Sequence, residues 1–168
     1  MSTEELAYCY LDSPVGALLA ARDGATLRYL SFSTGKRPRQ PDATWRADKT
    51  GFEAIAAQLG AYFRGELEVF DIPLHLTGTD FQKSVWRALA EIPFGQTISY
   101  GELARRVGNP KASRAVGMAN NANPIPIVIP CHRVIGANRS LTGFGGGLET
   151  KEFLLKHEGV LADQPRLL

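Results

Sequence analysis

The sequence has too little cysteine and histidine for several common kinds of protein. Of its 168 residues, two are cysteine and three are histidine, without paired C-x-x-C or H-x-x-x-H spacing. Two cysteines, Cys9 and Cys131, cannot build the disulfide framework of a small secreted domain, and the spacing matches no structural zinc site. We therefore expect no bound metal, and no residue pattern calls for a cofactor.

Long apolar runs and a basic leader are also missing. The chain begins MSTEELAYCYLDS, with acidic residues where a signal peptide carries positive charge. No apolar run approaches the roughly 18 residues that a membrane span needs. We therefore expect a cytoplasmic protein without a membrane partner. Apolar residues at 44% and charged residues at 21% are typical of globular domains, and the length allows one ordinary domain or two small ones.

The net charge of +2 hides an uneven distribution along the chain. Residues 1–78 carry eight Lys/Arg and ten Asp/Glu, whereas residues 79–168 carry eleven and seven. Most of the excess lies within residues 81–139, with eight basic and two acidic side chains. The basic ones are Lys83, Arg87, Arg105, Arg106, Lys111, Arg114, Arg133 and Arg139. Such an excess suits a phosphate-binding surface, although many basic patches are only solvated faces.

The first segment of the chain predicts a small sheet. Short apolar runs at residues 6–11, 17–21 and 26–32 are separated by turn residues, which favours an antiparallel meander. The polar, proline-containing segment 33–50 predicts an exposed connection.

A helix and a last strand complete this first part. The helical period begins at Gly51 and ends near Gly65, and residues 69–76 (VFDIPLHL) predict a further strand. The face of the helix is formed by Phe52, Ile55, Ala56, Leu59, Tyr62 and Phe63. Turn residues at Thr77-Gly78 coincide with the change of charge, so we expect one domain over 1–78 and another over 79–168.

Three helices are predicted in close succession in the second part. The first begins at Thr79 or Asp80, the second opens with a capping box from Ser99 to Glu102, and the third covers residues 111–120. Two helices joined by a glycine-containing turn match the helix-turn-helix pattern, whose second helix enters a DNA groove. An ordinary helical hairpin packed on a core fits the same residues.

Cys131 follows the most unusual stretch of the chain. Three prolines between residues 124 and 130 exclude a helix, so we expect a stiff, apolar, extended segment that ends at the cysteine. A cysteine beside His132 and Arg133 is a candidate nucleophile, because basic neighbours favour the thiolate. A buried cysteine that only packs is the alternative.

These residues resemble a known family. The run PCHRV, preceded by NPIPIVI and followed by TGFGGGLETKEFLLKHEG, is similar to the active-site signature of O6-alkylguanine-DNA alkyltransferases. The resemblance includes GTDFQKSVWRALAEIPFGQTISYGELA and GNPKASRAVG, and so covers most of residues 79–159. It implies an α+β fold, in which an N-terminal ribonuclease-H-like α/β domain precedes a mainly helical C-terminal domain with a helix-turn-helix.

The resemblance also implies a reaction. The protein would bind the minor groove of double-stranded DNA and flip out an O6-alkylguanine, because the alkyl carbon cannot be reached inside the stack. Cys131 would then take the alkyl group irreversibly and act only once; O4-alkylthymine is a second expected substrate. His132 and Glu158 would generate the thiolate through a water molecule, Tyr100 would give a proton to guanine N3, and Asn123 would hold the turn that carries the cysteine.

Further contacts are implied by the same resemblance. Arg114 would occupy the space left by the flipped base. The implied DNA contacts are Arg114, Ser113, Ala115, Tyr100 and Lys111, and the implied substrate contacts are Val134, Gly145, Phe144 and Pro126.

Two other classes of protein remain open. Alkyltransferase-like proteins bind damaged DNA without repairing it and carry tryptophan in place of the cysteine, so Cys131 favours a working repair protein. A thiol hydrolase with an incidental basic face is the third class. We expect a monomer in solution, and the sequence leaves cooperative assembly on DNA open.

Overall fold

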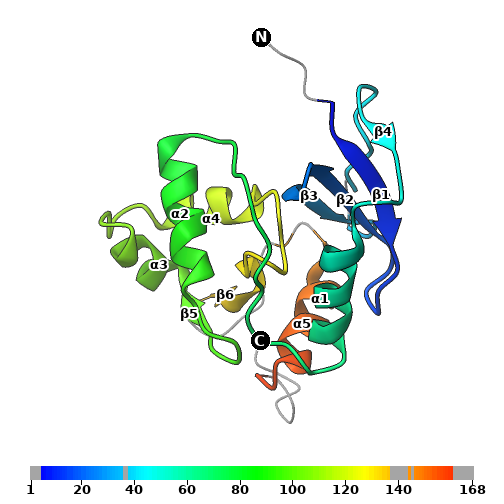
Figure 1. Ribbon diagram of the computed structural model, residues 1–168. Helices are drawn as coiled ribbons and strands as arrows, with labels where there is room; N and C mark the ends of the chain where they lie inside the picture. Colours follow the sequence, from blue (N-terminus) through cyan, green and yellow to red (C-terminus); the bar gives the residue numbers. More distant parts are fainter. Residues whose placement is uncertain (1–4, 36–37, 137–143, 145, 161–168) are drawn as a thin grey trace.

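The chain folds into a small sheet with a helix packed on it, followed by a mainly helical part (Figure 1). A computed structural model describes residues 5–35, 38–136, 144 and 146–160. The first sheet consists of β1 (Ala7–Leu11), β2 (Leu18–Asp23), β3 (Thr26–Phe32) and β4 (Arg46–Ala47), in the order β3-β2-β1-β4. This arrangement confirms the predicted α+β fold class.

The predicted meander is present as the strands β1, β2 and β3. Neighbouring strands pair antiparallel, and Ala20 of β2 lies between Cys9 of β1 and Leu30 of β3. The β2–β3 turn uses Gly24 at a φ of 60°, a conformation that glycine adopts at little cost. Local turn chemistry is therefore sufficient to define this part of the sheet.

One part of the connection at 33–50 differs from expectation. Arg46 and Ala47 form the short strand β4, which pairs parallel with β1. The amide of Arg46 donates to the carbonyl of Leu6 over 2.8 Å, and that of Asp48 to Tyr8 over 2.9 Å. Both β4 residues are exposed, so they carry no apolar alternation from which a strand could be predicted.

Helix α1 (Glu53–Phe63) lies where the helical period predicts it. Its buried face consists of Ile55, Leu59 and Tyr62, and Gly65 follows at a φ of 77°. Ala56, which the period also places on this face, is exposed.

The prediction of a strand at residues 69–76 is wrong. Only an isolated bridge forms there, between Leu74 and Leu27 of β3. The amide of Leu27 donates to the carbonyl of Pro73 over 2.8 Å, and that of His75 donates back to Leu27 over 3.2 Å. Pro73 has no amide hydrogen to extend a ladder, so pairing with the sheet stops at this single bridge.

Helix α2 (Asp80–Ala90) begins with a complete capping box. The amide of Gln82 donates to the hydroxyl of Thr79, and the side chain of Gln82 accepts from the amide of Thr79, both over 3.0 Å. On its inner face, the indole of Trp86 donates to the carbonyl of Ala119 over 2.8 Å. This bond fixes α2 against the fourth helix.

Helices α3 (Tyr100–Arg106) and α4 (Ser113–Asn121) form the predicted pair. Ser99 caps α3 by accepting from the amide of Glu102 over 3.0 Å. The reciprocal half of the predicted capping box is absent, because the carboxylate of Glu102 binds Arg105 and Arg106 instead.

The two parts of the chain share one hydrophobic core. Short strands β5 (Ile98–Ser99) and β6 (Val134–Ile135) pair parallel beside the helices, and α5 (Leu148–His157) returns to lie next to α1 (Figure 1). A single buried cluster runs from Leu18 and Leu30 of the sheet to Val85 and Leu154 of α2 and α5. None of the described helices is long and apolar enough to cross a membrane.

Candidate active site

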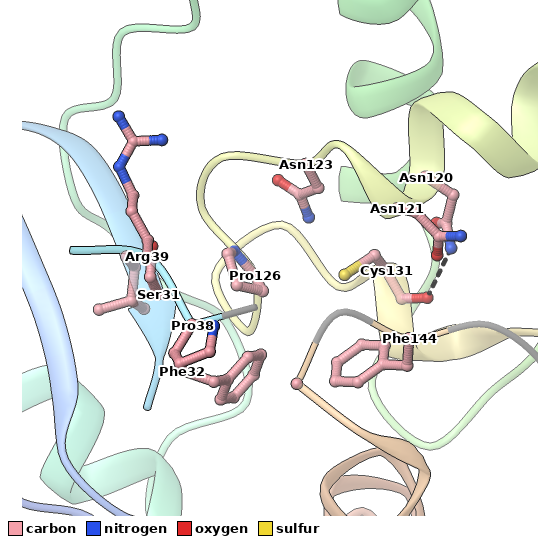
Figure 2. Close-up of a pocket in the computed structure, with 12 residues that line it drawn as sticks. Ser31, Phe32, Pro38, Arg39, Asn120, Asn121, Asn123, Pro126, Cys131 and Phe144 are labelled. Carbon is pink, nitrogen blue, oxygen red and sulfur yellow. Dashed lines mark hydrogen bonds between the residues drawn. The ribbon is translucent and has the colours of Figure 1, made fainter. Parts of the chain in front are cut away.

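Cys131 lies in a pocket between the two parts of the chain (Figure 2). Its residue is 4% exposed, and its sulfur points into the pocket, on the side of Pro126 (Figure 2). The pocket is lined by Leu30, Ser31, Phe32, Pro38 and Arg39 from the first part, and by Asn120, Asn121, Asn123, Pro126, Cys131, Phe144 and Gly146 from the second. The sulfur of Cys131 therefore faces a pocket, although the residue is buried.

The segment before Cys131 is a turn, so the prediction of an extended segment is wrong. The amide of Ile129 donates to the carbonyl of Ile125 over 2.9 Å, and Ile127 has a left-handed φ of 74°. The side chain of Asn123 closes the turn by accepting from Ile125 over 3.0 Å and donating to the carbonyl of Ile129 over 2.7 Å. Prolines exclude a helix but not a turn, and the two hydrogen bonds of the Asn123 side chain stabilise the turn.

Cys131 opens a short 3-10 helix, Cys131–Arg133. Its own amide donates to the carbonyl of Ile129 over 2.8 Å, and that of Arg133 donates to Pro130 over 3.0 Å. The cysteine and histidine are thus placed by a tight turn rather than by an extended chain.

Arg133 does not belong to the basic surface in which the charge count placed it. It is 6% exposed, and its guanidinium binds Glu158 through Nε over 2.8 Å and Nη2 over 3.0 Å. Its Nη1 donates to the carbonyl of Ile92 over 2.6 Å. Arg139, counted in the same patch, lies outside the described residues.

Glu158 follows directly after α5, and its carboxylate accepts hydrogen bonds from three buried side chains. His132 Nε2 lies 2.7 Å from Glu158 Oε2, and the hydroxyl of Tyr62 donates to the same oxygen over 2.6 Å. Arg133 completes this group, and all four residues are buried. The expected His132–Glu158 pair is therefore present, with two further partners that the sequence did not indicate.

The protonation states follow from these contacts. Burial opposes ionisation of Glu158, but the bonds from His132, Arg133 and Tyr62 hold its pKa well below the usual range. Burial lowers the pKa of His132, and the bond to Glu158 opposes that effect without cancelling it. Because ionised Glu158 only accepts, His132 Nε2 is the donor, which makes Nδ1 the basic nitrogen.

Cys131 is a neutral thiol in the resting protein. Burial raises the pKa of Cys131 to about 11, against opposing effects of the Asn123 side chain and the charge of Lys151. The Nδ1 atom of His132 is buried and makes no hydrogen bond within the described residues. The site thus holds a thiol and a neutral base in the same interior region.

Two residues near Cys131 have roles that sequence reasoning missed. Asn120 donates from Nδ2 to the carbonyl of Cys131 over 3.4 Å, and the ammonium of Lys151 donates to the carbonyl of Val134 over 2.7 Å. Lys151 is fully buried, and burial lowers its pKa to about 8. A usable signal was present, because Lys151 shares a helical face with the buried Leu154 and Leu155.

The residues expected to contact DNA lie on the outside of the helix pair. Ser113, Arg114 and Ala115 are exposed on the first turn of α4, and Lys111 is exposed just before it. Tyr100, at the start of α3, packs against α4; a Cβ at Gly117 would lie 3.7 Å from its ring.

The expected substrate contacts are only partly brought together. Pro126 and Phe144 line the pocket with Cys131, and the ring of Phe144 lies 5.5 Å from that of Phe32. Val134 is fully buried in β6, where its carbonyl accepts from Lys151. Gly145 lies outside the described residues.

Comparisons with known proteins cover nearly the whole chain. The family model described as 6-O-methylguanine DNA methyltransferase, ribonuclease-like domain, matches residues 6–76, and that described as the DNA binding domain matches residues 80–160. A methylated-DNA--protein-cysteine methyltransferase of Methanosarcina acetivorans is 55% identical over 90% of this chain and 97% of its own length. One from Haemophilus influenzae is 48% identical over 92% and 87%.

A solved structure has the same fold. The crystal structure of Mycobacterium tuberculosis OGT in complex with DNA superposes with a TM-score of 0.86 at 49% identity, over 90% of this chain and 92% of that one. A ribonuclease-like part, a helix-turn-helix and a cysteine beside a His–Glu pair define a DNA-repair transferase that uses its own thiol. The chain belongs to the 6-O-methylguanine DNA methyltransferase family.

Proposed function

We propose that this protein repairs DNA directly by moving the alkyl group of an O6-alkylguanine onto the sulfur of Cys131. One observation carries the proposal: the pocket-facing thiol of Cys131 lies next in sequence to His132, whose imidazole binds the ionised Glu158 over 2.7 Å. We assign residues 79–168 to DNA binding and alkyl transfer, and residues 1–78 to the support of that part.

The reaction begins with loss of the thiol proton. A water molecule passes the proton of Cys131 to Nδ1 of His132, and Glu158 stabilises the imidazolium that forms. The buried ammonium of Lys151 stabilises the thiolate. The base Nδ1 is available for this step because Nε2 is engaged with Glu158.

Transfer then exchanges one bond for another. The sulfur of Cys131 forms a bond to the alkyl carbon as the bond between that carbon and O6 breaks, and the electron pair of the broken bond passes to the purine. Tyr100 gives its hydroxyl proton to N3, so that neutral guanine leaves rather than its anion. Asn123 holds the turn in place during the step through its two hydrogen bonds.

The exposed start of α4 supplies the contacts to DNA. Arg114 enters the duplex where the damaged guanine has left the stack, while Ser113, Ala115 and Lys111 meet the adjoining backbone. Tyr100, packed on α4, assists rotation of the nucleotide. Pro126 and Phe144 form the walls that receive the base.

Transfer is expected to stop at one alkyl group per protein molecule. The product is a thioether, which thiols do not reduce, and Cys9 is buried in β1, paired with Ala20. Incubation with duplex DNA containing O6-methylguanine, followed by mass spectrometry, should find one methyl group on the Cys131 peptide. Tight binding without modification would favour a damage-binding protein, and neither binding nor transfer would favour a thiol hydrolase.

Arg114→Ala should impair base flipping without impairing alkyl transfer to Cys131. The Arg114 side chain offsets the cost of unstacking the damaged guanine by taking its place in the duplex. Without it, flipping costs a few kcal/mol more, so single-turnover transfer from duplex DNA should slow by about 100-fold. Reaction with free O6-benzylguanine, which needs no flipping, should keep its rate. Arg64→Ala, an exposed arginine after α1, is the matched control. Equal losses on both substrates would contradict the assignment.

A further inference from the structure

The His132–Glu158 pair receives a hydrogen bond from the other part of the chain. Tyr62, in the last turn of α1, donates its hydroxyl to Oε2 of Glu158 over 2.6 Å across 96 residues of sequence. We propose that Tyr62 is a positioning residue for alkyl transfer, whose hydroxyl draws charge from the carboxylate oxygen that binds His132 and so sets the basicity of that imidazole. The inference rests on the proposed function.

Arg133 and Tyr62 act on the carboxylate in different ways. The guanidinium of Arg133 spans both oxygens of Glu158, over 2.8 Å and 3.0 Å, and is itself fixed on the carbonyl of Ile92. This fork holds the carboxylate in place. Tyr62 binds only Oε2, the oxygen that also receives His132, so its hydroxyl competes directly with the imidazole for the charge of that oxygen.

Tyr62 is enclosed by α5 and by aromatic rings. The main-chain carbonyl of Tyr62 accepts from Nε2 of His157 over 2.6 Å, and its ring lies 4.9 Å from the His157 ring. Rings of Phe63, Phe70 and Phe94 surround it at 5.1, 5.4 and 6.3 Å. Burial and the charge of Glu158 raise the pKa of Tyr62 far above its usual range, so the hydroxyl keeps its proton and remains a donor.

The direction of the effect follows from the charges that face His132. Glu158 favours the imidazolium, whereas the cations Arg133 and Lys151 disfavour it. Removal of the Tyr62 hydroxyl leaves both cations in place and returns charge to Oε2, which strengthens its bond to the Nε2 proton. The imidazole of His132 then binds protons more tightly.

Tyr62→Phe tests this directly, because it keeps the ring and the bond from His157. His132 titration followed by NMR in the DNA-free protein should move to higher pH, with proton affinity up by about threefold to tenfold. The acid limb of the single-turnover rate profile should move with it, since the reaction needs neutral His132. The inference would be overturned if His132 titrates at the same pH in both proteins. It would also be overturned if His132 does not titrate in either protein.

The two readouts separate this inference from the proposed function. If the wild-type protein transfers no methyl group, the proposed function fails, and the NMR titration still decides whether Tyr62 controls His132. A uniform loss of rate at every pH, with an unmoved titration, would reduce Tyr62 to a packing residue and overturn the inference.

Two further variants serve as a control and as an alternative test. His157→Phe removes the hydrogen bond from α5 to the main-chain carbonyl of Tyr62 and leaves the Tyr62 hydroxyl and Glu158 unchanged, so it should lower thermal stability and leave the pH profile unmoved. Replacement of Tyr62 by 3-fluorotyrosine keeps the hydroxyl and makes it a stronger donor, so His132 should titrate at lower pH. This second variant decides the question if Tyr62→Phe does not fold, and an upward or absent shift would overturn the inference.

Discussion

Serine at position 131 should abolish alkyl transfer while the protein still binds DNA. The Cys131→Ser hydroxyl is a much weaker nucleophile than a thiolate, and His132 cannot ionise it to a useful extent. The proposed DNA contacts on α3 and α4 do not involve Cys131, so affinity for duplex DNA containing O6-methylguanine should stay close to that of the wild type. Single-turnover assays and binding titrations on the same duplex measure the two properties separately.

The other cysteine supplies the control for this variant. Cys9 is buried in β1, and burial raises its pKa, so it is a poor nucleophile. Cys9→Ala should therefore take up one full equivalent of methyl on Cys131. Methyl uptake by Cys131→Ser would contradict the assignment of the nucleophile.

Glu158→Gln should damage both stability and reactivity. The amide leaves the buried guanidinium of Arg133 without its counter-ion, and loss of one partner from a buried pair costs about 3–5 kcal/mol of unfolding free energy. It also removes the charge that stabilises protonated His132, so methyl transfer should become very slow even below the unfolding temperature. Chemical denaturation and single-turnover assays on the folded fraction measure the two effects.

The same variant should lose part of the acid sensitivity of the wild type. The folded-state pKa of Glu158 is lowered, so its contribution to stability is complete above about pH 4.3, the value in the unfolded chain, and falls as pH drops further. Glu158→Gln should lack that decline. Glu152→Gln, on the exposed face of α5 beside Lys156, is the control and should leave stability and its pH dependence nearly unchanged.

Local signals predicted most of the elements. The Asp23-Gly24 turn, the cap at Thr79 and the apolar face of α1 each depend on residues close in sequence. The structure confirms the turn and the cap, and it confirms the apolar face except at Ala56. The strand expected at 69–76 fails for a non-local reason. Ile72 is buried in the core, but Pro73 limits pairing with the sheet to a single bridge, and composition cannot separate packing from pairing.

The candidate site was predictable only in part, because its electrostatics join distant segments. The resemblance supplied Cys131, His132 and Glu158, and the structure places His132 on Glu158. In the sequence, Arg133 looked like one more basic residue of a charged surface. Tyr62 looked like one more residue on the apolar face of a helix. Neither sequence position shows that both side chains meet the same carboxylate, since the end of α5 must pack against α1 to reach Tyr62 and against the 3-10 helix to reach Arg133.

The single core that crosses the two parts of the chain affects how variants of this protein should be interpreted. Because Leu18, Leu30 and Leu154 belong to one buried cluster, loss of packing in the sheet weakens the part that carries Cys131 as well. A substitution deep in β2 would then appear in cells as lower abundance and lost repair, although it lies far from any DNA contact. Defects in repair would map to the whole interior rather than to the neighbourhood of the cysteine.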